Sequence, residues 1–273
     1  MKLKFTKMHG LGNDFVLVDC RESDPGNWTE LAQRLADRHF GIGCDQVLLL
    51  RDSEVADYRM EIINADGSQV EMCGNGIRCF ALYLKDNGLI TGDEARVETL
   101  AGLQVCKLYG DLVEVDMGEP ELEGRRIPVD ADGVVKEYPL LLGDTSVLVT
   151  CVSMGNPHAV IFVDDAERYP VAEMGPQIEN HPFFPRRTNV EFVEALSRTR
   201  LRMRVWERGS GQTLACGTGA CATAVAAFWT GRAERESEVI LDGGTLKINW
   251  EAESNHVFMT GPAATVFEGE FYL

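Results

Sequence analysis

The chain has 273 residues, of which 45% are hydrophobic and 25% charged, and its formal net charge at pH 7 is −17. This length and composition indicate a soluble globular protein with room for two domains, each with its own core. The acidic excess, with no basic run longer than two residues, argues against nucleic-acid binding, and no run approaches the ~18 apolar residues of a membrane-spanning helix.

Short strands are predicted along most of the chain, because β-branched residues alternate with polar ones between Gly, Asp and Asn residues. The first part contains expected strands at Lys2–His9, Phe15–Asp19, Val47–Arg51, Tyr58–Asn64, Ala95–Thr99, Gly102–Tyr109 and Leu112–Met117. The second part contains expected strands at Ser146–Ser153, Ala159–Val163, Asn189–Ala195, Leu201–Glu207, Glu238–Leu241, Gly244–Ala252 and Asn255–Thr260, and VFEGEFYL supplies a last one. Four helices are expected, at Trp28–His39, Asn75–Asn87, Val171–Asn180 and Thr218–Thr230.

The second part of the chain repeats the first at a fixed offset of 143 residues. Cys73 begins the segment CGNGIRC, and Cys216, at that offset, begins CGTGAC. Polar residues and glycines recur at the same offset: Asn13 with Asn156, Gln46 with Asn189, Asn64 with Glu207, Gly88 with Gly231, and Gly118 with Gly261. We therefore interpret the chain as two diverged copies of one unit.

The expected fold is α+β, with two pseudo-symmetric homologous domains that are each a β-sheet wrapped around a central helix. The first domain spans residues 1–118 and is completed by a tail strand within 262–273; the second spans 119–261. A linker is expected near Gly118–Arg126, which is rich in Glu, Pro and Gly. The two CG-x-G turns are expected to face each other, so that the active site lies in the cleft between the domains.

Each of the two repeated cysteines is expected to lie just before the N-terminus of a helix. Unpaired backbone N–H groups and the helix dipole favour a thiolate there, and such positions lower the pKa of a thiol toward or below neutrality. The neighbouring glycines leave the backbone amides open to an anion such as a substrate carboxylate. Two facing cysteines could then remove a proton from one face of a carbon and donate one to the other, which inverts a stereocentre.

Other interpretations apply to the remaining cysteines. A cysteine in an apolar run is most often a small buried residue, and we expect this of Cys20, Cys44, Cys79, Cys106, Cys151 and Cys221. Without a signal peptide in MKLKFTKMHG, free thiols and a cytoplasmic location are expected. No Cys-x-x-Cys motif and no nucleotide-binding glycine motif occurs, so no metal and no cofactor are expected.

The repeated polar residues also have two interpretations. Asn13 and Asn156 lie beside glycines and could be turn residues, but their shared offset favours ligands of a substrate. Glu207 and Arg208 could form a surface ion pair, or Arg208 could bind a second carboxylate. His158 could be a satisfied loop histidine, or could tune the protonation of a cysteine together with Glu207.

At these residues the sequence resembles the diaminopimelate epimerases. The segments MHGLGNDF, GCDQ, NADGS, CGNGIRC, GNPH, TNVEF and ERGSGQTLACGTGACA are similar to signature segments of that family and occur in order from residue 7 to 221. The resemblance implies a cofactor-independent, two-base interconversion of LL- and meso-2,6-diaminopimelate, a small-molecule substrate, in lysine and peptidoglycan synthesis. It also implies a homodimer.

By the same resemblance, Cys73 and Cys216 are the acid–base pair; His158 and Glu207 are our own candidates for modulating their pKa values. The amides at Gly74, Asn75, Gly217 and Thr218 would bind the reacting carboxylate. The rest of the substrate would be held by Asn13, Gln46, Asn64, Asn156, Asn189, Glu207 and Arg208.

Three alternatives remain. A racemase or epimerase of the same fold could act on another amino acid such as proline or hydroxyproline, but a substrate with one carboxylate gives no reason for Arg208. A thiol redox protein could use the two cysteines as a switchable disulfide. A binding module for an amino acid would tolerate Cys→Ser substitutions without loss of function.

Overall fold

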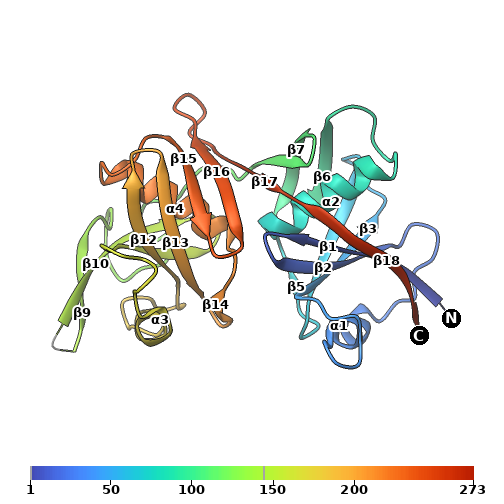
Figure 1. The fold of residues 1–273 in the computed structure, drawn as a ribbon, viewed down its shortest axis with the longest axis horizontal. Helices are drawn as coiled ribbons and strands as arrows, with labels where there is room; N and C mark the ends of the chain where they lie inside the picture. The colour runs from blue at the N-terminus through green and yellow to red at the C-terminus, as the bar shows by residue number, and fades with distance from the viewer. Residues whose placement is uncertain (1, 144) are drawn as a thin grey trace. The chain divides into compact units, whose positions relative to one another are not determined.

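The computed structural model describes residues 2–143 and 145–273. Met1 and Asp144, which the two expected domains include, lie outside the described residues. The chain divides into two units, the first comprising Met1–Asp116 with Thr260–Leu273 and the second Met117–Met259. Figure 1 shows both units as sheets with few helices, which confirms the expected α+β class.

The sheet of unit 1 begins with an antiparallel hairpin of β1 (Lys2–Gly10) and β2 (Asn13–Asp19). Strand β2 runs parallel to β3 (Gln46–Arg51), and β3 pairs antiparallel with β4 (Tyr58–Asn64). The two-residue strand β5 (Gln69–Val70) pairs with β4, and β6 (Glu94–Thr99) runs parallel to β4. The meander continues with β7 (Gly102–Tyr109) and β8 (Leu112–Asp116), and the C-terminal strand β18 (Ala264–Tyr272) pairs antiparallel with β1.

Unit 2 repeats this connectivity. Strands β10 (Thr145–Ser153) and β11 (Pro157–Phe162) form the hairpin, and β11 runs parallel to β12 (Asn189–Ser197). The strands that follow are β13 (Arg200–Glu207), β14 (Gly211–Thr213), β15 (Glu236–Leu241) and β16 (Gly244–Trp250). As β6 does beside β4, β15 runs parallel to β13. Strand β17 (Val257–Pro262) leads from unit 2 into unit 1.

The register of the parallel pairs is the same in both units. Phe15 of β2 pairs with Gln46 of β3, and His158 of β11 pairs with Asn189 of β12. His158 lies 143 residues after Phe15, and Asn189 lies 143 residues after Gln46. The internal repeat predicted from the sequence is therefore present in the strand pairing as well.

One helix lies at the centre of each unit. Helix α2 (Gly74–Asp86) contacts strands β1, β2, β3, β6, β7, β8 and β18, and helix α4 (Gly217–Trp229) contacts β10, β11, β12, β13, β15 and β16. Ten of the thirteen residues of each helix are buried. Both helices end before a glycine at positive φ, Gly88 and Gly231, whose amides bond back to the last turn.

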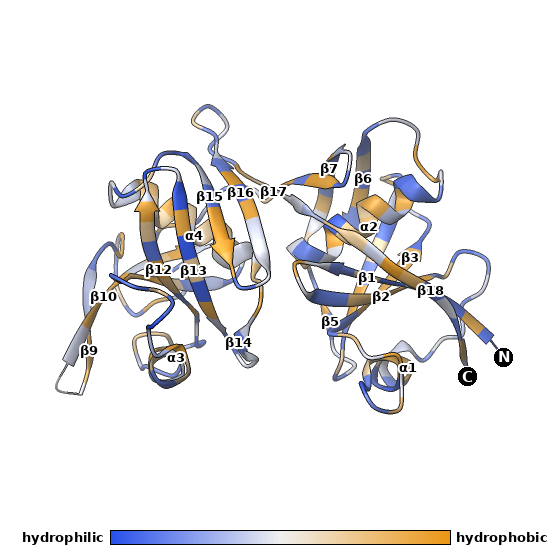
Figure 2. Cartoon of the chain, in the orientation of Figure 1, coloured by the Kyte–Doolittle hydropathy of each residue, from blue (hydrophilic) through white to orange (hydrophobic). Residues whose placement is uncertain are grey.

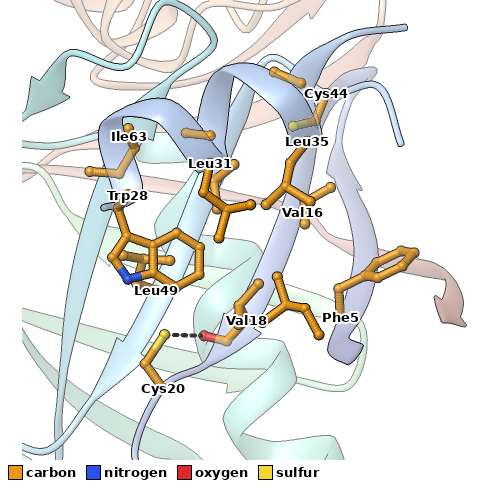
Figure 3. Packing of buried hydrophobic residues seen from close by; sticks show 14 residues of the cluster. Phe5, Val16, Val18, Cys20, Trp28, Leu31, Leu35, Cys44, Leu49 and Ile63 are labelled. Carbon is orange, nitrogen blue, oxygen red and sulfur yellow. Dashed lines mark hydrogen bonds between the residues drawn. The ribbon is translucent and has the colours of Figure 1, made fainter. Parts of the chain in front are cut away.

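The outer helices cover the opposite sides of these sheets. Helix α1 (Trp28–Ala36) buries Trp28, Leu31 and Leu35 against Val16, Val18 and Leu49, as Figure 3 shows, because its apolar residues recur at three- and four-residue spacing. Helix α3 (Val171–Glu179) packs its apolar face on a matching cluster in unit 2. Along the strands, hydrophobic and hydrophilic residues alternate (Figure 2), as in β15, where every second residue is buried.

Two sequence expectations differ from the structure. The segment 118–126, expected as a linker, is paired with unit 2, since Glu121 forms a bridge with Ser153. It leads into Ile127 and Val129, which are buried in the core of that unit. The strands β5, β9 (Tyr138–Leu142) and β14 were not predicted; β9 pairs antiparallel with β10. None of the helices in the described residues has the length and apolar character needed to cross a membrane.

Candidate active site

The two repeated cysteines occupy the N-cap positions of the two central helices. Cys73 precedes α2 and Cys216 precedes α4, each with extended backbone angles. The backbone N–H of Gly76 donates to Cys73 Sγ at 3.4 Å, so the thiol sulfur caps the helix. Cys216 Sγ lies 3.6 Å from the hydroxyl of Thr218. Both sulfur atoms therefore lie where the first helical amides are unpaired by the helix itself.

Glycines in the first turn let each helix lie close to its sheet. A Cβ on Gly76 would be 3.2 Å from Leu48 Cδ2, and a Cβ on Gly219 would be 2.8 Å from Glu191 Oε1. A side chain at either position would push the helix start away from the strand below. The glycine-rich motif thus sets the position of the cysteine as well as opening the amides to a ligand.

Around Cys73 the polar side chains are bonded to one another. The Cys73 thiol donates to Asn13 Oδ1 at 3.8 Å, and Asn75 Nδ2 donates to the same oxygen at 3.1 Å. The amide of Asn13 in turn donates to Asp45 Oδ2 at 2.7 Å. Asn75 and Asp45 therefore hold the Asn13 side chain beside the Cys73 sulfur. Three of the predicted residues of unit 1, Asn13, Cys73 and Asn75, thus form one cluster.

Two further predicted residues of unit 1 pair across strands β3 and β4. Gln46 Nε2 donates to Asn64 Oδ1 at 2.8 Å, and Asn64 Nδ2 donates to Ser68 Oγ at 3.0 Å. Gln46 Oε1 is buried and has no hydrogen-bond partner among the described residues. Buried acceptors are nearly always satisfied in proteins, so this oxygen is suited to a donor group of a ligand.

Cys216 differs from the sequence expectation of an acidic thiol. Burial raises its pKa well above the usual range, and the nearby carboxylate of Glu207 raises it further. The residue is 5% exposed. Desolvation disfavours the thiolate more than the half charge of a helix N-terminus favours it, so the expected lowering is wrong for Cys216 in this structure.

Beneath Cys216 lies a buried pair of ionisable residues. His158 Nδ1 is 2.7 Å from Glu191 Oε1, and both side chains are fully buried. His158 Nε2 is 2.9 Å from Asn156 Oδ1. His158 therefore lies on β11 and not in a loop, and it is the middle of a buried chain from Glu191 to Asn156.

The remaining predicted residues gather in the turn after β13. Arg208 N–H donates to Asn189 Oδ1 at 2.9 Å, and Asn189 Nδ2 donates to the carbonyl of Pro157 at 2.9 Å. Arg208 is exposed, and its guanidinium donates to the carbonyl of Arg186 at 3.2 Å. Glu207 accepts a hydrogen bond from the hydroxyl of Thr213. Asn189 thus joins the start of β11 to the turn that carries Arg208.

Sequence reasoning missed two buried glutamates. Glu179 accepts from Trp206 Nε1 at 2.7 Å and from the N–H of Gly209 at 2.9 Å, and so fixes the same turn from helix α3. Glu191 was missed although the repeat contained a signal for it. Its position in the first copy is Leu48, so a glutamate stands in an apolar strand where the other copy has a leucine.

Comparison with known proteins gives the following relationships. Residues 5–123 and 150–266 match the family model described as diaminopimelate epimerase. The diaminopimelate epimerase of Acetivibrio thermocellus is 52% identical over 274 residues, covering 98% of each chain. That of Moorella thermoacetica is 54% identical over 278 residues, covering 99% of this chain and all of the relative.

Solved structures share the fold at low identity. A PhzF-family phenazine biosynthesis protein of Bacillus anthracis has a TM-score of 0.74 and 17% identity, with each chain covered completely. A hydroxyproline epimerase from Agrobacterium vitis has a TM-score of 0.71 and 16% identity, covering 99% of this chain and 91% of the other. At these identities the likeness shows the two-unit architecture alone.

Proposed function

Because the chain belongs to the diaminopimelate epimerase family, we propose that it is an isomerase that interconverts LL- and meso-2,6-diaminopimelate. The assignment of the substrate rests on sequence identity: about half of all residues are identical to those of curated family members along nearly the whole chain. The observation that supports the reaction type is the pair of cysteines, each at the N-cap of a central helix.

In the proposed reaction, Cys73 and Cys216 act on opposite faces of one α-carbon. A thiolate at one cysteine takes the α-proton as the C–H bond breaks, and the thiol of the other gives its proton as the new C–H bond forms. The raised pKa of Cys216 makes it the thiol before reaction with one epimer, with Cys73 as the base. The roles exchange for the other epimer. Because only protons move between the two sulfurs and the α-carbon, the reaction needs no external oxidant or reductant.

The substrate carboxylate at the reacting carbon would bind the first amides of the central helices, at Gly74, Asn75, Gly217 and Thr218. Helix N-termini carry about half a positive charge, and they stabilise the negative charge that develops on the carboxylate when the α-proton leaves. The polar side chains would hold the rest of the substrate. These are Asn13, Gln46, Asn64, Asn156, Glu207 and Arg208, with Asn189 supporting the backbone of Arg208.

The test is proton exchange at the α-carbon of LL-diaminopimelate in D2O, followed by NMR under reducing conditions. The wild type should place solvent deuterium in the inverted product, and Cys73→Ala and Cys216→Ala should each lose inversion. Cys106→Ala is a matched control, because Cys106 is a buried thiol on β7 outside the cluster, and it should keep the activity. Activity retained in either catalytic variant would contradict the two-cysteine mechanism.

The same experiment separates the alternative substrates. Proline and hydroxyproline carry a single carboxylate, and neither should be inverted at a comparable rate. Inversion of either one without action on diaminopimelate would overturn the substrate and leave the mechanism standing. We further propose, on the resemblance, a cytoplasmic homodimer that serves lysine and peptidoglycan synthesis; complementation of a diaminopimelate auxotroph and light scattering of the purified chain test these points.

A further inference from the structure

The two catalytic cysteines have different surroundings below them. Under Cys73, the first turn of α2 rests on apolar side chains, since Gly76 lies against Leu48 and Phe15. At the corresponding positions of unit 2 stand Glu191 and His158. The pair of residues beneath Cys216 is therefore ionisable, whereas the equivalent pair beneath Cys73 is apolar.

The hydrogen bonds of the pair restrict where its protons lie. Both nitrogens of the His158 ring face an oxygen, Glu191 Oε1 at Nδ1 and Asn156 Oδ1 at Nε2. An amide oxygen only accepts, so Nε2 carries a proton and donates to Asn156. The contact between Nδ1 and Glu191 then needs one more proton, on either the ring or the carboxyl.

Burial places that second proton on the carboxyl. Glu191 is fully buried, and its Oε2 has no hydrogen-bond partner among the described residues. A carboxylate in this position would leave negative charge on a bare oxygen, which is far more costly than a neutral carboxyl with one carbonyl oxygen unpaired. Burial also raises the pKa of Glu191, in the same direction, although His158 opposes the shift.

We propose that Glu191 is a protonated positioning residue that donates to His158 Nδ1, fixes the ring with its proton on Nε2, and thereby turns the Asn156 amide so that its NH2 group faces the substrate. The proposal rests on the proposed function in taking Asn156 as a substrate ligand. In unit 1 the equivalent Asn13 is oriented differently, by Asn75 and Asp45. The equivalent asparagines of the two units are thus oriented by different neighbouring residues.

Other ionisable groups surround Glu191 on neighbouring elements. They are Cys151 on β10, His158 on β11, Glu207 at the end of β13 and Cys216 before α4. An ionised Glu191 would repel the Glu207 carboxylate and would disfavour the thiolate forms of Cys151 and Cys216. A neutral Glu191 removes a negative charge from below Cys216 and leaves Glu207 as the carboxylate that acts on that thiol.

The first test is independent of turnover. Long-range 1H–15N NMR of the imidazole rings, with His158→Phe used to assign the signal, should show a neutral ring protonated on Nε2 in the wild type. In Glu191→Gln the side-chain NH2 can still donate to Nδ1, so the same tautomer should persist. A ring protonated on Nδ1, or a doubly protonated ring, in the wild type near pH 7 would overturn the proposal.

The second test compares steady-state kinetics on diaminopimelate. Glu191→Gln should keep KM within a few-fold of wild type, because it conserves the donor. Glu191→Leu should raise KM by about tenfold, the effect of one misplaced hydrogen-bonding group, with a smaller change in kcat. A loss in Glu191→Gln as large as in Glu191→Leu would overturn positioning by a donated hydrogen bond.

The double variant H158F/E191L separates positioning from packing, because it installs the Phe and Leu pair that unit 1 carries below Cys73. It should unfold at a temperature close to that of the wild type but keep the raised KM. A wild-type KM in the double variant would show that the pair only fills space. If the wild type does not act on diaminopimelate, the proposed function fails, whereas the NMR result still decides the state of the pair.

Discussion

Gly219 faces the carboxyl group of Glu191 at the position where a side chain would begin, whereas the equivalent Gly76 faces the side chain of Leu48. An added Cβ would be 2.8 Å from Glu191 Oε1 but 3.2 Å from Leu48 Cδ2. Leu48 can shift its methyl group by a few tenths of an ångström. Glu191 has less freedom, because its Oε1 is bonded to His158.

Gly219→Ala should therefore destabilise the protein more than Gly76→Ala, although both place alanine at the same point of a helix. We expect a difference of about 1–2 kcal/mol in the free energy of unfolding, in the range of overpacking in a close-packed core. Urea denaturation of both variants measures it. Glu191→Leu should reduce the penalty of Gly219→Ala; an equal penalty in that background would show that Glu191 is not the obstacle.

Gly175 on helix α3 of unit 2 also leaves no room for a side chain. A Cβ on this residue of α3 would lie 2.4 Å from Trp206 Cγ. Gly175→Ala gains up to ~1 kcal/mol of helix propensity, but overpacking against a ring typically costs ~1–3 kcal/mol, so the net change should be destabilising. Because Trp206 immediately precedes Glu207 and Arg208, KM for diaminopimelate should rise as well. Calorimetry and kinetics test this, and Glu173→Ala, an exposed position on the same helix, should change neither.

Most of the regular structure could be predicted from the sequence. Strands β4 and β7 were predicted with the bounds that they have, and the central helices begin one residue earlier than expected, at Gly74 and Gly217. Strand β9 was missed because Pro139 interrupts its apolar run, which is typical of edge strands. Strands β5 and β14 have two and three residues, too few to show an alternating pattern.

The contents of the site were less predictable than its position. The repeat brought out positions that are polar in both copies, but Glu191 has an apolar counterpart, Leu48, and forms its contact only once β11 and β12 pair in parallel register. The thiol of Cys216 was misjudged for a related reason. The sequence shows that a helix begins after it, but its burial and its nearness to the Glu207 carboxylate arise from the tertiary structure.

Buried thiols should make the protein sensitive to alkaline pH. Burial raises the pKa values of Cys20, Cys44, Cys79 and Cys106 to about 12. A thiol pKa that is higher in the folded chain means that the unfolded chain loses its proton first, so stability is complete below the ordinary thiol pKa near 9 and falls as pH rises toward 12. Cys106→Ala removes one such group. Its stability relative to wild type should improve by about 1.4 kcal/mol per pH unit between pH 9.5 and 11.5; a constant difference over this range, measured by urea denaturation, would contradict it.

Asp14 should have the opposite effect at acid pH. Burial alone would raise its pKa, but hydrogen bonds from Arg38 and Lys7 outweigh burial and hold the pKa at about 2. A pKa that is lower in the folded chain means that this stability is present above the ordinary value near 4 and is lost as pH falls through 2. Asp14→Asn should be less stable than wild type at pH 6 and should approach it below pH 3.

The position matters for the site because Asp14 accepts a hydrogen bond from the backbone N–H of Asp45, whose carboxylate holds Asn13. KM should therefore rise in this variant at neutral pH, while an Asp14→Asn enzyme with unchanged KM would show that the ion-pair cluster stabilises unit 1 without orienting Asn13.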